Sequence, residues 1–402
     1  MEIKKVSKQN RNIVGEITLT GSKSICNRAL IIRAFSKKDY PIHRIAAAKD
    51  TQTLIELLNN ESDVYDAGPA GTTFRFMTAY LAMQDGTQTL TGSERMQQRP
   101  IKPLVSVLQE LGASIGYLGE EGFPPLKIIG KKLLSKIIEI DGGISSQYIS
   151  ALMLIAPKIE GGLKIKLKGT VVSRSYINLT VSVLKKAGIE VGFVGNEISI
   201  KETTKLPETV DIDVEADWSA AAFWYGWVAL TPGSAINLLG LNSISAQGDC
   251  KLIPYFEGLG VRTKEIENGL RIYKVDMVLP SHLEINLINQ PDLAQPLAVV
   301  CAILGVEVKL NRLQTLIIKE TNRLQAMQTE LANFGVVSEI TGDSIFIASQ
   351  KVSPPKRKIK TYNDHRMAMS FALFAARVPL EIEDPDVVSK SYPNYFEHII
   401  QS

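Results

Sequence analysis

The residues best suited to chemistry lie at an expected helix start, in the segment Gly21-Ser22-Lys23-Ser24-Ile25-Cys26-Asn27-Arg28. A turn of small residues leads there into an apolar helix, and the first backbone N–H groups of such a helix are free to bind an anion. Lys23 adds a cation, and Ser24 and Arg28 share one helical face. The segment is not a P-loop, because Ser22 stands where that motif needs a glycine. Alone, it is equally typical of a capped surface helix.

Five further segments pass in the same way from polar or glycine-containing residues into a strongly apolar run. The six expected helices begin near Lys23, Thr72, Ser146, Trp218, Asp292 and His365. After a first interval of 49 residues, the intervals are 74, 72, 74 and 73 residues. A period this regular indicates an internal repeat.

A second, amphipathic helix is expected 31–34 residues after each start, near Leu54, Leu104, Leu179, Leu252, Leu324 and Phe396. Four of these helices end at a glycine suited to a left-handed C-cap: Gly112, Gly188, Gly260 and Gly335. Strand-like runs fill the gaps at 16–19, 163–167, 189–191, 306–310 and 344–347. The pattern predicts six units of roughly strand, helix, strand, helix and strands, in an α/β (α+β) architecture.

The polar segment 201–213 divides the six units into two groups of three. Because a strand region precedes the first unit, the chain is expected to leave one domain near residue 20 and to return near residue 215. We therefore predict a discontinuous domain, 1–19 plus 216–402, and an inserted domain, 20–215. Helices that point their N-termini inward would create an anion-attracting cleft between the two, where the active site is expected.

The composition excludes several classes of function. The 45 Lys and Arg residues nearly balance the 42 Asp and Glu residues, so no global basic field invites nucleic acid. The three cysteines, Cys26, Cys250 and Cys301, are far apart, which argues against a disulfide framework and for a reducing compartment. The four histidines are scattered without metal-ligand spacing. The longest apolar runs, 220–230 and 297–304, are too short to span a bilayer. We expect a cytoplasmic protein without a metal.

Candidate site residues gather at the helix starts of the repeat. The first three units offer Lys23, Ser24, Arg28, Gly71, Thr72, Arg99, Ser145, Ser146, Gln147, Ser173 and Tyr176. The last two units offer Asp292, Lys319, Glu320, Arg323, His365, Arg366 and Lys390. Each has an ordinary interpretation as well, since Ser145 is a typical N-cap and Asp292 a typical first-turn acid. The return of similar residues at one phase of the repeat favours function over chance.

Six motifs, in order along the chain, closely resemble the 5-enolpyruvylshikimate-3-phosphate (EPSP) synthase family. They are Gly21-Ser22-Lys23-Ser24 with Asn27-Arg28, Ala70-Gly71-Thr72 with Arg75, Leu90-Thr91-Gly92 with Arg99-Pro100-Ile101, Ser145-Ser146-Gln147, Lys319-Glu320-Thr321 with Arg323, and Tyr362-Asn363-Asp364-His365-Arg366-Met367-Ala368-Met369. Each motif is weak to moderate alone, but the six together are highly specific. The resemblance implies two domains of three βαβαββ units each, in the inside-out α/β barrel of the enolpyruvyl transferases.

The resemblance also implies a reaction, in which the enolpyruvyl group of phosphoenolpyruvate passes to the 5-hydroxyl of shikimate 3-phosphate without metal or cofactor. The residues implied for phosphoenolpyruvate are Lys23, Gly71, Arg99, Gln147, Arg323, Arg366 and Lys390. Those implied for shikimate 3-phosphate are Lys23, Ser24, Arg28, Ser145, Ser146, Gln147, Ser173, Tyr176, Asp292, Thr315 and Lys319. The catalytic candidates are Asp292 as base, Glu320 as acid and Lys23 for charge stabilisation.

Four positions depart from the family pattern. Pro69 stands where asparagine is usual, Thr315 where many members have an asparagine that touches the shikimate phosphate, Asn322 where aspartate is common, and Lys49 where an acid is frequent. None removes a reacting group. The altered contacts are expected to affect substrate affinity or sensitivity to glyphosate, in a direction that the sequence does not indicate.

Three alternatives stay open. The related UDP-N-acetylglucosamine enolpyruvyl transferase uses a loop cysteine shortly before the arginine that corresponds to Arg99, but residues 93–98 contain none. A non-catalytic anion-binding protein on this fold would not need Lys23, Asp292 and Glu320 together. A nucleic-acid role, suggested by fold kinship with RNA 3′-phosphate cyclases, conflicts with the balanced charge. A monomer acting on small molecules, away from membranes, is the family expectation.

Overall fold

The computed structural model describes residues 3–6, 12–36, 40–203 and 210–401. The chain divides into two compact units. Unit 1 is Met1–Thr20 with Glu215–Ser402, and unit 2 is Gly21–Val214. Residues 204–209 of the polar segment noted in the sequence lie outside the described residues.

Unit 2 contains two four-stranded sheets of one topology, in which a parallel pair is extended by two antiparallel strands. The first sheet has the order β4 (Val64–Asp66), β5 (Thr87–Thr91), β7 (Leu126–Ile129) and β6 (Ser114–Tyr117). The second has the order β8 (Ile137–Asp141), β9 (Leu163–Lys168), β11 (Glu197–Ile200) and β10 (Val191–Val194). A short parallel pair joins β3 (Ile42–His43) to β12 (Ile212–Asp213).

The helices of unit 2 lie between these strands in the sequence. They are α1 (Lys23–Ser36), α2 (Lys49–Leu58), α3 (Gly71–Leu81), α4 (Glu94–Gln97), α5 (Lys102–Glu110), α6 (Ser146–Ile155), the 3₁₀ turn η1 (Ala156–Lys158) and α7 (Arg174–Lys186). Side chains of β9 alternate strictly between buried and exposed, whereas nine of the ten residues of α6 are buried. The sheets therefore expose one face, and α6 is enclosed.

Unit 1 repeats the same sheet topology twice. One sheet has the order β2 (Val14–Thr18), β13 (Ala235–Leu239), β15 (Gly269–Lys274) and β14 (Val261–Ile266). The other has the order β16 (His282–Asn286), β17 (Glu307–Asn311), β19 (Ser344–Ile347) and β18 (Ser338–Thr341). In addition, β1 (Ile3–Val6) pairs antiparallel with β20 (Leu380–Glu383), and Ile359 bridges to Ile382.

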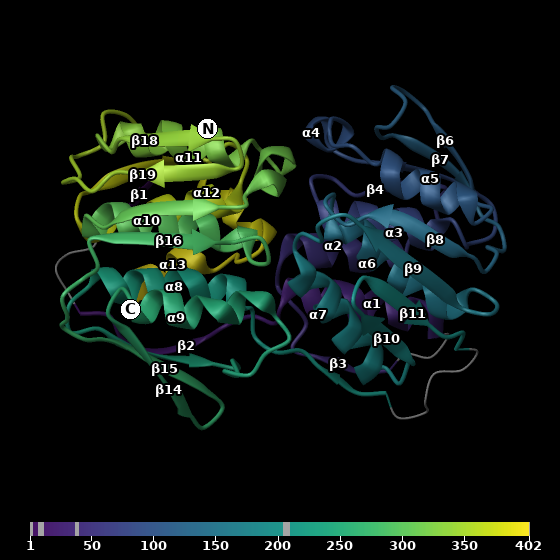
Figure 1. Ribbon diagram of the computed structural model, residues 1–402, viewed down its shortest axis with the longest axis horizontal. Coiled ribbons are helices and arrows are strands. Elements are labelled where there is room, and N and C mark those ends of the chain that lie inside the picture. Colours follow the sequence, from purple (N-terminus) through teal and green to yellow (C-terminus); the bar gives the residue numbers. More distant parts are fainter. Residues whose placement is uncertain (1–2, 7–11, 37–39, 204–209, 402) are drawn as a thin grey trace. The chain divides into compact units, whose positions relative to one another are not determined.

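The helices of unit 1 are mostly enclosed by these sheets. They are α8 (Trp218–Leu230), η2 (Gly248–Lys251), α9 (Leu252–Glu257), η3 (Pro291–Leu293), α10 (Ala294–Leu304), η4 (Gln314–Ile318), α11 (Arg323–Asn333), α12 (His365–Ala372), η5 (Leu373–Ala376), η6 (Pro385–Lys390) and α13 (Tyr395–Gln401). In Figure 1, α8 lies between the sheet that contains β14, β15 and β2 and the sheet that contains β16, β18 and β19. Twelve of the thirteen residues of α8 are buried, which explains its nearly uniform apolar sequence.

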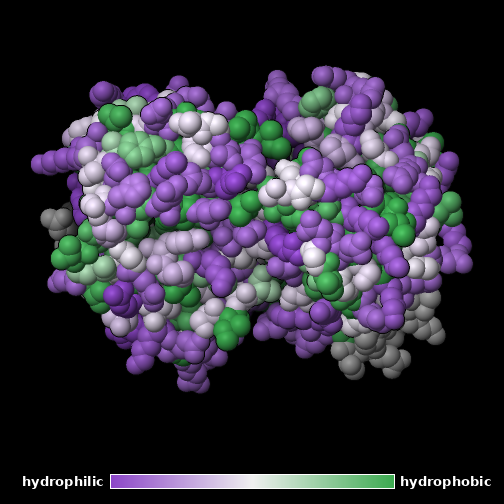
Figure 2. All heavy atoms as spheres, viewed as in Figure 1, coloured by the Kyte–Doolittle hydropathy of each residue, from purple (hydrophilic) through white to green (hydrophobic). Residues whose placement is uncertain are grey.

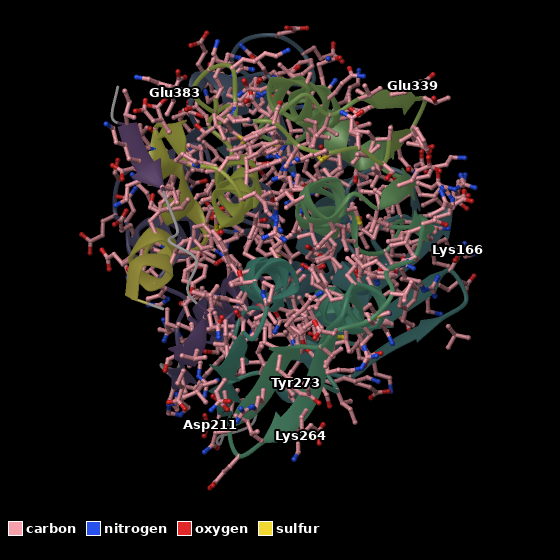
Figure 3. All side chains as sticks on the ribbon, turned by 90° about the vertical axis from the view of Figure 1, so that its left-hand side faces the viewer. Lys166, Asp211, Lys264, Tyr273, Glu339 and Glu383 are labelled. Atoms are coloured by element: carbon pink, nitrogen blue, oxygen red, sulfur yellow. The ribbon has the colours of Figure 1, made fainter. Side chains whose placement is uncertain are left out.

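Polar side chains cover most of the face shown in Figure 2, with hydrophobic residues in small separate patches. Figure 3 places Lys264, Glu339 and Glu383 at the outer edge of unit 1. Each unit keeps its own hydrophobic core beneath this surface. No helix within the described ranges is both long and apolar enough to cross a bilayer.

The α/β architecture expected from the repeat is confirmed, with one correction. Four copies of strand-helix-strand-helix-strand-strand are complete, whereas the first and last units are shortened in the part of the chain that the structure describes. The chain passes directly from α2 into β4, so the first unit has no antiparallel pair of its own. In the last unit, β20 pairs instead with β1, a strand from the other end of the chain.

Helix boundaries follow the sequence closely for most of the leading helices of the repeat. Five of the six leading helices begin within one residue of the expected start, and α10 begins after the single turn η3, which contains Asp292. In contrast, α2 and α7 begin five residues before Leu54 and Leu179, because their polar first turns hide the period. All four expected C-cap glycines have positive φ, of 103°, 75°, 83° and 76° in chain order.

The aromatic stack around Phe334 provides a test of the unit 1 core. Phe334 is fully buried and its ring centroid lies 3.6 Å from that of Phe374. We expect Phe334→Ala to lower the free energy of unfolding by about 3–5 kcal/mol, measured by thermal unfolding. Val278→Ala, at a side chain that is 93% exposed, is the control and should change stability by less than about 0.5 kcal/mol. Equal effects of the two substitutions would contradict the packing.

Candidate active site

The centre of the candidate site in unit 1 is Arg323, whose side chain is only 2% exposed. Its Nε and Nη2 donate to the two carboxylate oxygens of Asp364, at 2.7 and 3.2 Å. Nη1 donates to Asp292 Oδ1 at 2.8 Å, and Nη2 also donates to Glu320 Oε2 at 3.0 Å. Burial alone would lower the pKa of Arg323, but the three carboxylates outweigh it and raise the pKa above its ordinary value. The guanidinium is therefore a permanent cation.

Asp292 is the point where further cations meet. Arg366 Nη2 lies 3.3 Å from Asp292 Oδ2, and Lys319 Nζ lies 3.8 Å from Asp292 Oδ1. Arg366 Nη1 also donates to the backbone oxygen of Asp292 at 3.1 Å. Together with Arg323, three cations surround one carboxylate that is 10% exposed.

Glu320 joins Arg323 to a fourth cation. Lys390 Nζ donates to Glu320 Oε1 at 2.9 Å, while the other oxygen accepts from Arg323. The side chains of Lys390 and Glu320 are 8% and 14% exposed. We call Asp292, Lys319, Glu320, Arg323, Asp364, Arg366 and Lys390 the unit 1 cluster.

Helix starts position this cluster. Arg323 opens α11, whose cap Asn322 accepts from the backbone N–H of Gln325 at 3.3 Å. Asp364 caps α12 by accepting from the backbone N–H of Arg366 at 2.9 Å, while it also binds the Arg323 side chain. Asn322, a departure from the family pattern, thus retains a capping function.

A second buried carboxylate, Asp249 in η2, adjoins the cluster through a serine. Ser219 Oγ donates to Asp249 Oδ2 at 2.5 Å and accepts from Arg366 Nη2 at 3.1 Å. Burial raises the pKa of Asp249 to about 6, against the lowering effect of Arg366.

In unit 2, Lys23 opens α1 and pairs with a buried acid. Its Nζ donates to Asp50 Oδ2 at 3.0 Å. Asp50 belongs to the first turn of α2, and its backbone oxygen accepts from Thr73 Oγ1 of α3 at 2.9 Å. The starts of α1, α2 and α3 therefore meet at Asp50.

The starts of α3 and α6 also meet, at a buried arginine. A Cβ added to Gly71 would lie 2.6 Å from Nη1 of Arg99, so only glycine allows this approach. Arg99 is 6% exposed, and its buried Nε has no hydrogen-bond partner among the described residues. Gln147 Nε2 donates to Thr72 Oγ1 at 3.0 Å.

Other predicted residues of unit 2 have mainly structural contacts in this structure. Arg28 is 2% exposed and uses four N–H donors on Thr180 Oγ1, Ser150 Oγ and the backbone oxygens of Ser24 and Tyr176. Burial lowers the pKa of Arg28 to about 10. Ser145 caps α6 by accepting from the N–H of Gln147, and the buried Ser146 follows it. Ser173 precedes α7 with φ 53°, a left-handed conformation that is uncommon for serine.

Three buried acids of these networks, Asp50, Asp249 and Asp364, were not among the candidate site residues. Asp50 and Asp364 each lie next to a residue discussed in the sequence, Lys49 and His365, and each is a first-turn or capping acid. First-turn and capping acids are common on helices, so this position does not distinguish a site residue. For Asp249 the sequence spacing gives no signal either.

Thr315 Oγ1 is buried without a hydrogen-bond partner among the described residues. No group of three or more His, Cys, Asp or Glu in those residues has the arrangement of a metal site.

Comparisons with known proteins agree with the motif order. A family model described as EPSP synthase (3-phosphoshikimate 1-carboxyvinyltransferase) matches residues 56–399. A 3-phosphoshikimate 1-carboxyvinyltransferase of Bacteroides fragilis (strain YCH46) is 44% identical over 393 residues, 96% of this chain and 95% of that protein. One of Shewanella denitrificans is 34% identical over 418 residues, with 96% and 95% covered. A solved structure of EPSP synthase from Acinetobacter baumannii is similar with a TM-score of 0.79, at 22% identity, over 99% of this chain and 97% of that one.

The buried ion pairs predict a large stability effect at Arg323. Arg323→Gln leaves three carboxylates without their shared cation, so we expect a loss of about 3–5 kcal/mol in the free energy of unfolding. Thermal unfolding at neutral pH measures the change. The exposed Arg271 provides the control, because Arg271→Gln should cost less than about 0.5 kcal/mol. A change at Arg323 as small as that at Arg271 would mean that the cluster does not depend on this cation.

Proposed function

The chain belongs to the EPSP synthase family, and we propose that it transfers the enolpyruvyl group of phosphoenolpyruvate to the 5-hydroxyl of shikimate 3-phosphate. The products are 5-enolpyruvylshikimate 3-phosphate and phosphate, in the shikimate pathway to chorismate and the aromatic amino acids. The observation that best supports this activity is the unit 1 cluster, where Asp292 and Glu320 are held on Arg323 among three further cations.

Both substrates are anions, which explains the demand for cations. We assign phosphoenolpyruvate to Lys23, Gly71, Arg99, Gln147, Arg323, Arg366 and Lys390. We assign shikimate 3-phosphate to Lys23, Ser24, Arg28, Ser145, Ser146, Gln147, Ser173, Tyr176, Asp292, Thr315 and Lys319. Arginine binds carboxylate and phosphate through paired N–H donors.

The reaction requires one base and one acid in its first half. Asp292 accepts the proton of the 5-hydroxyl while the hydroxyl oxygen bonds to C2 of phosphoenolpyruvate, and Glu320, in its protonated form, gives its proton to C3. In the second half, C3 returns that proton to Glu320 and the bond between C2 and the phosphate oxygen breaks, which restores the double bond. Asp292 gives its proton to the departing phosphate. Substrate anions compete with Asp292 and Glu320 for Lys319, Arg366 and Lys390, so binding would free the carboxylates to exchange protons. Lys23 stabilises the charge that develops.

Two features separate this activity from the alternatives. The sister transferase that acts on UDP-N-acetylglucosamine needs a reactive loop cysteine, whereas Cys26, Cys250 and Cys301 are all buried. A protein that only binds anions has no use for two carboxylates held on one buried arginine.

The free cysteines fit the cytoplasmic location that we propose. Monomeric function is part of the same proposal and rests on the family resemblance.

The activity is tested by phosphate release from the purified protein with phosphoenolpyruvate and shikimate 3-phosphate, each omitted in turn, with a chelator present. Release that needs both substrates and survives chelation is the expected result. If no phosphate is released, UDP-N-acetylglucosamine replaces shikimate 3-phosphate as acceptor. Release with that acceptor would favour the sister transferase, and none with either would favour a binding protein.

The acid and base are tested by amide substitutions that preserve shape. We expect Asp292→Asn and Glu320→Gln to lower kcat by about 10²- to 10⁴-fold, because an amide cannot take or give the proton. Substrate binding, measured by calorimetry, should change much less. A variant with near-normal kcat would remove that residue from the mechanism.

The close approach of Gly71 to Arg99 predicts a specific binding defect. Gly71→Ala would push the Arg99 guanidinium aside, so we expect KM for phosphoenolpyruvate to rise by roughly 10- to 100-fold. KM for shikimate 3-phosphate should change less. Gly116 offers the matched control, because a Cβ there meets nothing within 4 Å. If Gly116→Ala and Gly71→Ala behave alike, the approach has no functional importance.

A further inference from the structure

The carboxylate of Asp249 has no part in the proton transfers proposed above, yet it is held inside unit 1 close to the cluster. Asp249 is 5% exposed and lies in η2, well before the segments that supply the catalytic acids. A buried carboxylate normally has a partner that compensates for the lost water. Its nearest recorded partner is the Ser219 hydroxyl, at 2.5 Å.

Ser219 connects this carboxylate to an arginine of the proposed phosphoenolpyruvate site. A serine hydroxyl has one hydrogen to donate and two lone pairs to accept. With its hydrogen directed at Asp249 Oδ2, the Ser219 oxygen is free to accept from Arg366 Nη2, at 3.1 Å. The hydrogen bonds therefore run in one direction, from guanidinium to hydroxyl to carboxylate.

The position of Ser219 is itself fixed. It occupies the first turn of α8, and its backbone N–H donates to Asp217 Oδ1 at 2.8 Å. Arg366 is also held by η3, because its Nη1 donates to the backbone oxygen of Asp292, and Nη2, the nitrogen that binds Ser219, lies 3.3 Å from Asp292 Oδ2. The guanidinium, 8% exposed, thus has anchors on two separate elements.

We propose that Asp249 is a positioning residue, which acts through Ser219 to orient Arg366 for the anionic substrate. The inference rests on the proposed function, because it assigns a role to the same site. Asp249 touches neither substrate nor reacting atoms in this scheme. It fixes the direction of the Ser219 hydroxyl, and the hydroxyl fixes one edge of the guanidinium.

The relay is sensitive to pH because a protonated Asp249 is a weaker acceptor for the Ser219 hydrogen and can itself donate to the Ser219 oxygen. Burial raises the pKa of Asp249 to about 6, and the charged groups that face it are Arg366 of α12, Asp292 of η3 and Asp217 at the start of α8. On its own element, Lys251 is exposed. Below about pH 6 the carboxyl group gains a proton, and Arg366 loses one of its anchors.

The test measures KM and kcat from about pH 5 to about pH 8, a window around the pKa of Asp249. We expect Asp249→Asn to raise KM for phosphoenolpyruvate roughly tenfold at neutral pH, the effect of one hydrogen bond to a charged group. Because binding is weakened equally in the ground and transition states, kcat and KM for shikimate 3-phosphate should stay within about twofold. The wild-type KM should rise below about pH 6 relative to that of the variant. Substrate protonation affects both proteins and cancels in this comparison.

Three further variants separate positioning from a loss of structure. Ser219→Ala breaks the relay while keeping the carboxylate and should reproduce the change in KM, and Ser219→Thr should restore it. Glu330→Gln alters another fully buried carboxylate of unit 1, which binds Arg357 and Tyr362. This control should lower the melting temperature without changing the pH dependence of KM.

A double-mutant cycle with Arg366→Gln decides whether the effect passes through Arg366. We expect Asp249→Asn to cause no further rise in KM in that background. An equal rise in both backgrounds, or a Ser219→Ala variant with the wild-type KM and pH dependence, would overturn the proposal. If the wild type releases no phosphate, the proposed function fails. The same cycle, measured as calorimetric binding of phosphoenolpyruvate, then decides for or against the relay.

Discussion

The structure of unit 1 depends on one constraint, the burial of the Arg323 guanidinium. A charge removed from water is costly unless opposite charges and hydrogen bonds replace the solvent. Arg323 meets this requirement with three carboxylates that come from η3, from the residues before α11 and from the cap of α12. Three segments that are distant in sequence must therefore converge on one point, and the carboxylates of Asp292 and Glu320 are fixed by the same interactions that stabilise the fold.

The two units balance charge differently. In unit 1, the carboxylates of the cluster and Asp249 accompany the four cations Lys319, Arg323, Arg366 and Lys390. In unit 2, Arg28 donates to neutral oxygens, and Arg99 is buried beside the backbone of Gly71 with its Nε unbonded. Positive charge that protein carboxylates leave uncompensated favours anionic ligands. Unit 1 thus compensates its buried cations with carboxylates, whereas unit 2 places Arg28 and Arg99 among neutral groups.

Much of the fold follows from local sequence rules. The C-cap glycine at Gly188 is predictable because only glycine adopts positive φ without strain, and the start at Trp218 is predictable because Asp217 caps a long apolar run. The pairing of β20 with β1 was not predictable, since short strands carry no signal for a distant partner. Similarly, a family motif identifies Arg323 and the repeat singles out Asp292, but neither predicts their contact. Asp249 escaped detection because its importance arises from burial, which depends on the complete tertiary structure.

The pairing of the first strand with the last has a consequence for synthesis on the ribosome. Every strand pair of unit 2 is complete once residue 214 has been made, whereas Ile3 pairs with Glu383 and Ile17 with Leu238. At roughly 5–20 residues per second, β1 waits about 20–80 s for its partner. During this time its backbone N–H and C=O groups form an open edge of the kind that chaperones and neighbouring nascent chains can bind. The inserted unit can thus mature first, and the unit that surrounds it in sequence must remain unfinished until residue 383 has been made.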